Sequence, residues 1–283
     1  MMFYRDDLLR RIPGYDKLIG KLDESITWEE FIELGKYFDP KINPLYFYPA
    51  DDYEGLICSY FELILNKDRN FFNNKPIDFY NNTAFSSLQF LVDLVNKYNV
   101  SPSMITQFKE NSCYQNFIDQ NGVFVRGWPS FERNIMQNSD NLEIAKHIKK
   151  AALPHRQGSG NGSIFGGWNL MIAKFSEHKP EVVKFIEYAS SDEAQEIMFA
   201  EGSFLPIKSG FYNDKKYLQK YPEFRYLKEL MDKGIHRPYF DDYTRISDII
   251  SYYAHKAIKM EMTVEQALFE ANEIIKENKV IIK

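Results

Sequence analysis

The sequence is poor in cysteine, in long apolar runs and in clustered charge, and each shortage excludes a class of protein. Its 283 residues include only two cysteines, Cys58 and Cys113, which are too far apart for a close-spaced zinc or redox motif. Because both lie in apolar helical patterns, we expect two buried free thiols. No run approaches the roughly 18 apolar residues of a membrane helix. The net charge of −5, with no basic block, predicts no nucleic-acid partner.

Motifs for catalysis, metal ions and cofactors are also missing. The five histidines show no metal-ligand spacing, and no Gly-x-Ser-x-Gly elbow occurs. The glycine-rich stretch 158–162 is not a phosphate loop, because no lysine followed by serine or threonine comes after it. The three lysines between Lys146 and Lys150 are expected on the solvated face of a short helix. The sequence therefore predicts no catalytic residue, no metal site and no cofactor.

Aromatic residues, by contrast, are abundant. They make up 16% of the chain, with 19 tyrosines and 23 phenylalanines. Flat aromatic faces match the C–H faces of sugar rings, so this composition is compatible with carbohydrate binding. A coding bias toward Phe, Tyr, Asn, Ile and Lys explains it equally well.

Apolar periodicity predicts alternating strands and helices. Two capping boxes, Thr27 with Glu30 and Thr263 with Gln266, mark helix starts. Strands are expected at Met1–Tyr4, Leu45–Tyr48, Gly122–Trp128 and Leu170–Ala173. The clearest helices are expected at Tyr53–Leu65, Thr83–Tyr98, Glu110–Asp119, Arg245–Lys259 and Val264–Asn278, and two more should follow Pro180 and Ser191. In the helix at Thr83–Tyr98, Phe85 is expected on the buried stripe.

The most informative stretch is Gly166-Gly167-Trp168-Asn169-Leu170, followed by the apolar run to Ala173 and two amphipathic helices. This order resembles the return segment of family 1 extracellular solute-binding proteins, the sugar-capturing components of ABC transporters. Other segments resemble the family in the same order along the chain: Met2–Leu9, Thr27–Phe31, Phe85–Tyr98, Phe117–Trp128 and His236–Tyr239.

The resemblance implies an α/β fold of periplasmic-binding-protein type II, with the carboxy-terminal lobe nearly complete and the amino-terminal lobe partial. Residues 1–164 and 223–283 would form the first of these, and residues 165–222 a remnant of the other. Hinges are expected near Gly162–Gly167 and Tyr221–Phe224. Three explanations for the missing lobe stay open: a truncated gene, a split protein completed by another chain or segment, or a domain cut from a larger regulator.

The resemblance also implies a ligand-binding site between the lobes. Trp128, Trp168 and Tyr53 would stack on sugar faces, Gly167 would offer its backbone, and Asp51 and Arg237 would bind hydroxyl groups, beside Tyr239. Each residue also has a purely structural interpretation. Trp128 fits the core, Trp168 fits hinge packing, and Asp51 fits a helix cap. Arg237 fits a surface pair with Asp241 or Asp242.

The function implied is capture of a mono- or oligosaccharide for an ABC importer permease, without catalysis. One alternative is a cytoplasmic ligand-sensing domain of a transcription regulator. A weaker alternative is a glycosidase, although no pair of acids is singled out. The family location is periplasmic or extracellular and membrane-anchored. The sequence at Met1–Asp7 is not a signal peptide, so a chain complete as written would be cytoplasmic.

Overall fold

The computed structural model describes residues 1–73, 76–131, 135 and 142–281. Within these ranges, a mixed sheet joins four strands in the order β2-β3-β1-β4. These strands are β1 (Met2–Arg5), β2 (Tyr46–Phe47), β3 (Phe124–Arg126) and β4 (Ile148–Ala151). β1 runs antiparallel to β3 and β4, while β2 runs parallel to β3. β1, β2 and β3 are buried throughout, so β3 ends inside the molecule at the predicted site.

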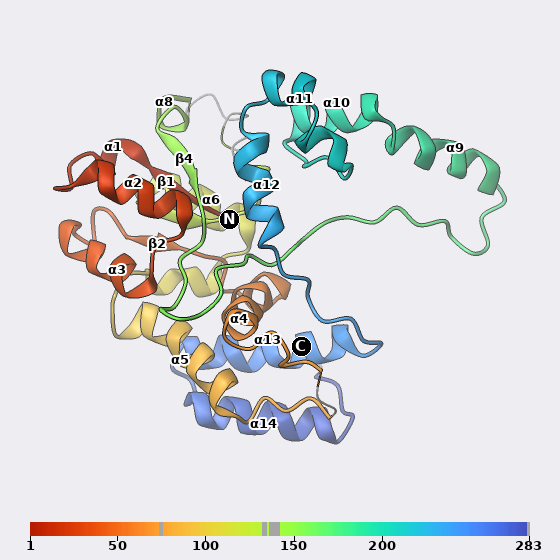
Figure 1. Cartoon of the computed structure of the whole chain (residues 1–283). Coiled ribbons are helices and arrows are strands. Elements are labelled where there is room, and N and C mark those ends of the chain that lie inside the picture. The colour runs from red at the N-terminus through yellow and green to blue at the C-terminus, as the bar shows by residue number, and fades with distance from the viewer. Residues whose placement is uncertain (74–75, 132–134, 136–141, 282–283) are drawn as a thin grey trace.

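Short helices surround this sheet (Figure 1). α2 packs against β4, and α6 packs against β2 and β3. The capping box of Thr27 with Glu30 is confirmed at the start of α3. The bounds of these helices are Asp6–Leu9 for α1, Tyr15–Glu24 for α2, Trp28–Glu33 for α3, Glu110–Asp119 for α6 and Leu142–Ala145 for α8.

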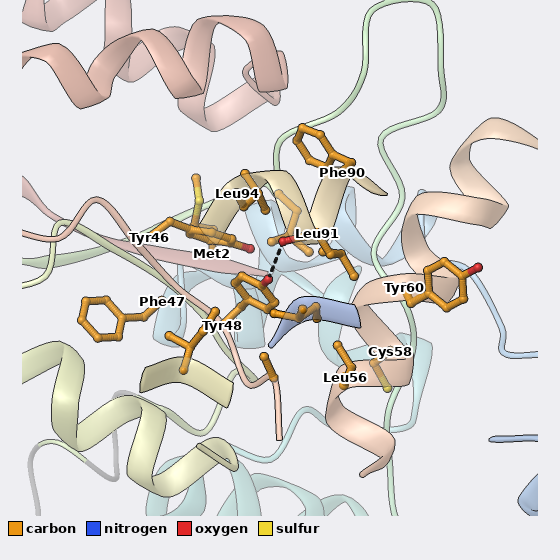
Figure 2. Packing of buried hydrophobic residues seen from close by; sticks show 14 of the residues in the cluster. Met2, Tyr46, Phe47, Tyr48, Leu56, Cys58, Tyr60, Phe90, Leu91 and Leu94 are labelled. Atoms are coloured by element: carbon orange, nitrogen blue, oxygen red, sulfur yellow. Dashed lines mark hydrogen bonds between the residues drawn. The ribbon is translucent and has the colours of Figure 1, made fainter. Parts of the chain in front are cut away.

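Four longer helices pack on one another in the lower half of the view in Figure 1. They are α4 (Glu54–Lys67), α5 (Asn82–Asn96), α13 (Tyr243–Ile258) and α14 (Val264–Lys276). The second capping box, Thr263 with Gln266, is confirmed at the start of α14. Their apolar faces join the sheet in one hydrophobic core, part of which is drawn in Figure 2. There the Tyr48 hydroxyl donates to the Leu91 carbonyl over 3.1 Å, which satisfies a buried polar group.

The remaining helices lie in the upper part of the view, where α9 stands away from the sheet at the end of a long extended segment and α10 leads back to α11 (Figure 1). Their bounds are Lys179–Ala189 for α9, Asp192–Gly202 for α10, Lys215–Lys220 for α11 and Phe224–Asp232 for α12. A second, smaller hydrophobic cluster lies here, formed by Phe211, Tyr212, Tyr217, Phe224 and Leu227. No residue of α9 is buried.

Three local predictions were wrong. Leu170–Ala173 is extended but forms no strand, because no neighbouring strand pairs with it among the described residues. The lysine-rich segment is not a helix: Ile148–Ala151 is the edge strand β4, in which Lys149 is exposed and Lys150 is half-buried. Phe85 is 39% exposed, so the buried stripe of α5 excludes it.

The proposed division into residues 1–164 with 223–283, and 165–222, stays a prediction. The larger core includes Ile164 and Ile235, while Phe224 and Leu227 belong to the smaller cluster. Ile164 and Ile235 pair as a parallel bridge, so the two segments that leave the larger core run side by side. Within the described residues, no helix is long and apolar enough to cross a membrane.

Candidate functional site

Trp128 follows the buried end of β3, where the sequence predicted a sugar-stacking ring. Its indole is half-buried. The indole Nε1 donates to Glu110 Oε1 over 3.3 Å, and the backbone N–H donates to the Tyr114 hydroxyl over 3.0 Å. The Arg126 guanidinium lies 5.5 Å from the ring centroid, within the range of a cation–π contact. Polar partners therefore fix the position of this ring.

The glycine pair Gly166-Gly167 lies on the first crossing segment (160–167), which leaves the larger core at Ile164, and Gly166 comes directly to this ring. A Cβ atom on Gly166 would lie only 2.7 Å from Cη2 and Cζ3 of Trp128, so the backbone at Gly166 is in close contact with the indole. At Gly167 no atom of the described residues lies within 4 Å of such a Cβ. Of the two glycines, Gly166 is the one whose missing side chain is required by packing.

Tyr53 precedes α4 and is the second aromatic near Glu110. Its hydroxyl is buried and has no hydrogen-bond partner in the described part of the chain. Burial, and secondarily the negative charge of Glu110, raise the pKa of Tyr53 far above its usual range. The Lys109 ammonium lies 5.7 Å from the ring centroid. The Glu110 carboxylate therefore lies near both the Tyr53 side chain and the Trp128 indole.

Asp51 is half-buried in the loop before α4. Its Oδ1 accepts from the Asp52 amide over 2.8 Å, and its carbonyl accepts from the Tyr53 amide over 2.9 Å. Ser251 on α13 donates to Asp52 Oδ1 over 2.6 Å. The loop next to Tyr53 is therefore stabilised by its own turn bonds and by α13.

Arg237 is not paired with Asp241 or Asp242; it forms an ion pair with Glu54 at the start of α4, over 2.5 Å. The hydroxyls of Tyr243 and Ser247 also donate to the Glu54 carboxylate. Asp242 pairs with Arg245 instead. Because Glu54 follows Tyr53 in sequence, Arg237 is brought to the same end of α4 as Tyr53 and Asp51.

The other predicted residues lie apart from this group. Trp168 is 92% exposed on the extended segment, and Gly167 beside it is exposed. Tyr239 is fully exposed at a separate open pocket of about 520 Å³. That pocket is also lined by Pro76, Phe240, Asp241, Arg245 and Lys276.

Sequence reasoning missed the charged groups beneath Trp128. Arg126 is buried, and its Nη2 lies 3.5 Å from Oε2 of buried Glu62 on α4. Burial alone would lower the pKa of Arg126, but the Glu62 carboxylate acts together with Cys58, Tyr46 and Tyr114, and the pKa is raised. Two features of the sequence could have pointed to this pair: Arg126 lies two residues before Trp128, and Glu62 is an acid inside the apolar pattern of α4. Both are weak, because their pairing depends on the tertiary fold.

Cys58 and Cys113 are buried free thiols, as predicted. Burial raises the pKa of Cys58 to about 11. Within the described residues, no group of three or more histidine, cysteine or acidic side chains could hold a metal ion.

Comparison with solved structures confirms the α/β fold of periplasmic sugar-binding proteins. The maltose-bound MalE3 of T. maritima is 28% identical, with a TM-score of 0.84 and coverage of 98% of this chain and 70% of that one. A solute-binding protein of Thermotoga lettingae TMO bound with alpha-D-tagatose is 22% identical, with a TM-score of 0.80 and coverage of 98% and 69%. One of Agrobacterium vitis S4 with bound D-mannitol is 17% identical, with a TM-score of 0.73 and coverage of 98% and 70%.

This chain spans about 70% of the length of the first of these proteins. The family described as bacterial extracellular solute-binding protein matches residues 1–226. The chain therefore belongs to the bacterial extracellular solute-binding proteins.

Proposed function

We propose that this chain binds a mono- or oligosaccharide at the surface formed around Trp128, Tyr53, Asp51 and Arg237, for delivery to an ABC importer permease. The observation that carries the proposal is the arrangement about Glu110, whose carboxylate accepts from the Trp128 indole and lies near the Tyr53 hydroxyl. Aromatic faces next to carboxylate and guanidinium groups are the combination that sugar rings and hydroxyls require.

Bound ligands in the similar structures support this choice of substrate class. The T. maritima protein holds maltose, and the A. vitis protein holds D-mannitol. Both ligands are rich in hydroxyl groups. We propose binding without chemical change of the ligand, at a location outside the cytoplasmic membrane, as the family description implies.

Gly167, Trp168 and Tyr239 enter the proposal as residues that meet the ligand or a partner on closure. In its extended position the Trp168 ring has 92% of its surface free. Two bodies that close about a hinge could bring such a ring to the Trp128 side. The short distance in sequence from Gly166, which contacts Trp128, to Trp168 favours this motion.

We further propose that a second polypeptide or chain segment covers the extended segment and α9 when the protein is active. The large apolar side chains exposed there support this: Trp168, Leu170, Met171, Ile172, Phe175, Val183, Phe185 and Tyr188. Many exposed large apolar side chains close together in sequence are typical of interaction sites. A partner that offers a sheet edge fits best, because 169–173 is extended and unpaired among the described residues.

Isothermal titration of the chain with maltose, D-mannitol, ribitol and alpha-D-tagatose tests the proposed function. We expect saturable binding of at least one ligand, and a loss of affinity of at least tenfold for Trp128→Ala, since a buried aromatic contact contributes about 2 kcal/mol or more. The proposal fails if the folded chain binds none of these sugars, or if Trp128→Ala binds as tightly as the unaltered chain.

A further inference from the structure

Helix α4 carries a polar stripe through an otherwise apolar helix. Glu54, Cys58, Glu62 and Asn66 recur every four residues, so they lie along one side of the helix. Most of the other residues between Gly55 and Leu65 are buried and apolar. Polar groups inside such a helix need partners. Here several come from the first crossing segment (160–167) and from the second (233–237), and others from β3 and α13.

At the carboxy-terminal end of the stripe, Asn66 holds the first crossing segment by its backbone. Its Nδ2 donates to the Gly162 carbonyl over 2.7 Å, and its Oδ1 accepts from the Gly162 amide over 2.8 Å. The Asn66 carbonyl accepts from the Gly160 amide over 2.9 Å. A Cβ on Gly162 would lie 2.2 Å from the Lys233 carbonyl oxygen, so this fit requires glycine.

One turn earlier, Glu62 holds the same segment. Its Oε2 accepts from the Ile164 amide over 2.9 Å. Ile164 in turn lies beside Ile235 of the second crossing: the Ile235 amide donates to the Ser163 carbonyl, and the Phe165 amide donates to the Ile235 carbonyl, each over 2.8 Å. Glu62 is therefore bonded to the first crossing segment and linked to the second through the pairing of that segment with Ile235.

The same Glu62 oxygen also faces the candidate site. Oε2 lies 3.5 Å from Nη2 of Arg126, whose guanidinium lies 5.5 Å from the Trp128 ring. The Arg126 Nε is buried, and no described residue accepts a hydrogen bond from it. Arg126 consequently depends on few contacts, and a small displacement of the Glu62 carboxylate changes a large part of its support.

We propose that Glu62 is a positioning residue that couples the crossing segment at Ile164 to the Arg126 guanidinium and, through it, to the Trp128 indole. A shift of the crossing moves the carboxylate oxygen that supports Arg126, and the ring above Arg126 responds. By reciprocity, a sugar that holds Trp128 also holds the crossing in one orientation. The sugar part of this inference rests on the proposed function; the coupling of Ile164 to Trp128 does not.

Fluorescence of a chain with one tryptophan tests the coupling without any ligand. Trp28→Phe and Trp168→Phe leave Trp128 as the remaining indole, since the chain has three tryptophans. In this background, Glu62→Gln keeps an oxygen for the Ile164 amide but removes the charge that faces Arg126. We expect a shifted emission maximum and stronger quenching by acrylamide. Glu54→Gln, the same change at the other end of the stripe, should leave both unchanged.

A double-mutant cycle separates positioning from a merely structural role. Asn66→Ala loosens the crossing at Gly162 without a contact to Arg126. We expect it to shift the Trp128 emission when Glu62 is present and to add nothing in the Glu62→Gln chain. Additive shifts, or an unchanged Trp128 emission in Glu62→Gln, overturn the proposal. Should Glu62→Gln fail to fold, Glu62→Gln with Arg126→Gln removes both charges, and a Trp128 response to Asn66→Ala in that chain overturns it equally.

Sugar titration of the same variants tests whether this coupling extends to sugar binding. We expect roughly tenfold weaker sugar binding for Glu62→Gln, in the usual range of coupling between sites. Unchanged affinity in Glu62→Gln overturns the inference that a bound sugar is coupled to the crossing. If the unaltered chain binds no sugar, the proposed function fails, whereas the emission cycle still decides the coupling.

Discussion

The indole of Trp128 rests on the backbone of Gly166, so closely that a methyl group at Gly166 would come within 2.7 Å of two ring carbons. This contact joins the end of β3 to the segment that crosses away from the larger core. The ring is held on other sides by Glu110 and Arg126. Trp128, which the sequence predicted to stack on a ligand, therefore also packs against the crossing segment.

The two adjacent glycines give a matched test of this contact. Gly166→Ala should push the Trp128 ring from its position and change its emission maximum, because the new Cβ overlaps the ring edge. Gly167→Ala should have little effect on the ring, since its Cβ would enter open space. Fluorescence of the chain with Trp128 as its remaining tryptophan measures both. Equal spectra for the two variants would contradict the packing described here.

Breaking the buried pair beneath Trp128 should be costly. Arg126→Met leaves the Glu62 carboxylate buried without its partner, and we expect a loss of about 3–5 kcal/mol in the free energy of unfolding. Adding Glu62→Gln to Arg126→Met should recover a large part of this loss, because no uncompensated charge remains. Urea denaturation followed by circular dichroism measures the three chains. A double variant no more stable than Arg126→Met alone would refute this account.

The Glu54 cluster should contribute to stability more than an exposed pair does. Glu54→Gln weakens the bonds from Arg237, Tyr243 and Ser247. We expect a loss of about 1–2 kcal/mol, allowing for partial exposure of the carboxylate. Glu143→Gln, which removes a fully exposed pair with Lys146, is the control and should leave the melting temperature unchanged. The result to look for is a lower melting temperature in Glu54→Gln alone.

Buried thiols should make the fold weaker at alkaline pH. Burial raises the pKa of Cys58 from 9.0 to about 11, and it raises the pKa of Cys113 further. The folded state then keeps protons that the unfolded state loses above pH 9, so the free energy of unfolding falls as pH rises. Each thiol contributes a slope of up to about 1.4 kcal/mol per pH unit. Denaturation between pH 8 and 10.5 should show a shallower decline for Cys58→Ala.

Helix α9 should tolerate polar substitutions that the small cluster does not. Phe185→Ser changes a side chain that is 59% exposed, so its effect on stability should lie within about 0.5 kcal/mol. Phe211→Ala removes a buried ring from the second cluster and should cost about 3–5 kcal/mol. The melting curves of the two variants measure both losses of stability. A large loss for Phe185→Ser would mean that α9 packs against the body of the protein.

Local signals predicted most elements well. The apolar spacing of Glu110–Asp119 gave a helix with those bounds, and both capping boxes formed, because these features depend on residues within one or two turns. The strand expected at Leu170–Ala173 did not form, since a strand needs a partner and the sequence of one segment does not supply it. The sequence also left α2 unpredicted.

By itself, the sequence determined most of the longer helices, that the thiols are buried, and that Trp128 lies at the end of a strand segment, two residues past β3, since hydrophobic periodicity and capping act over short distances. Only the tertiary structure decided that Arg237 meets Glu54 rather than Asp241, that Glu62 faces Arg126, and that Gly166 lies under Trp128. These pairs are brought together by packing of helices and strands far apart in the chain. The choice among several possible partners for one charge is made by that packing.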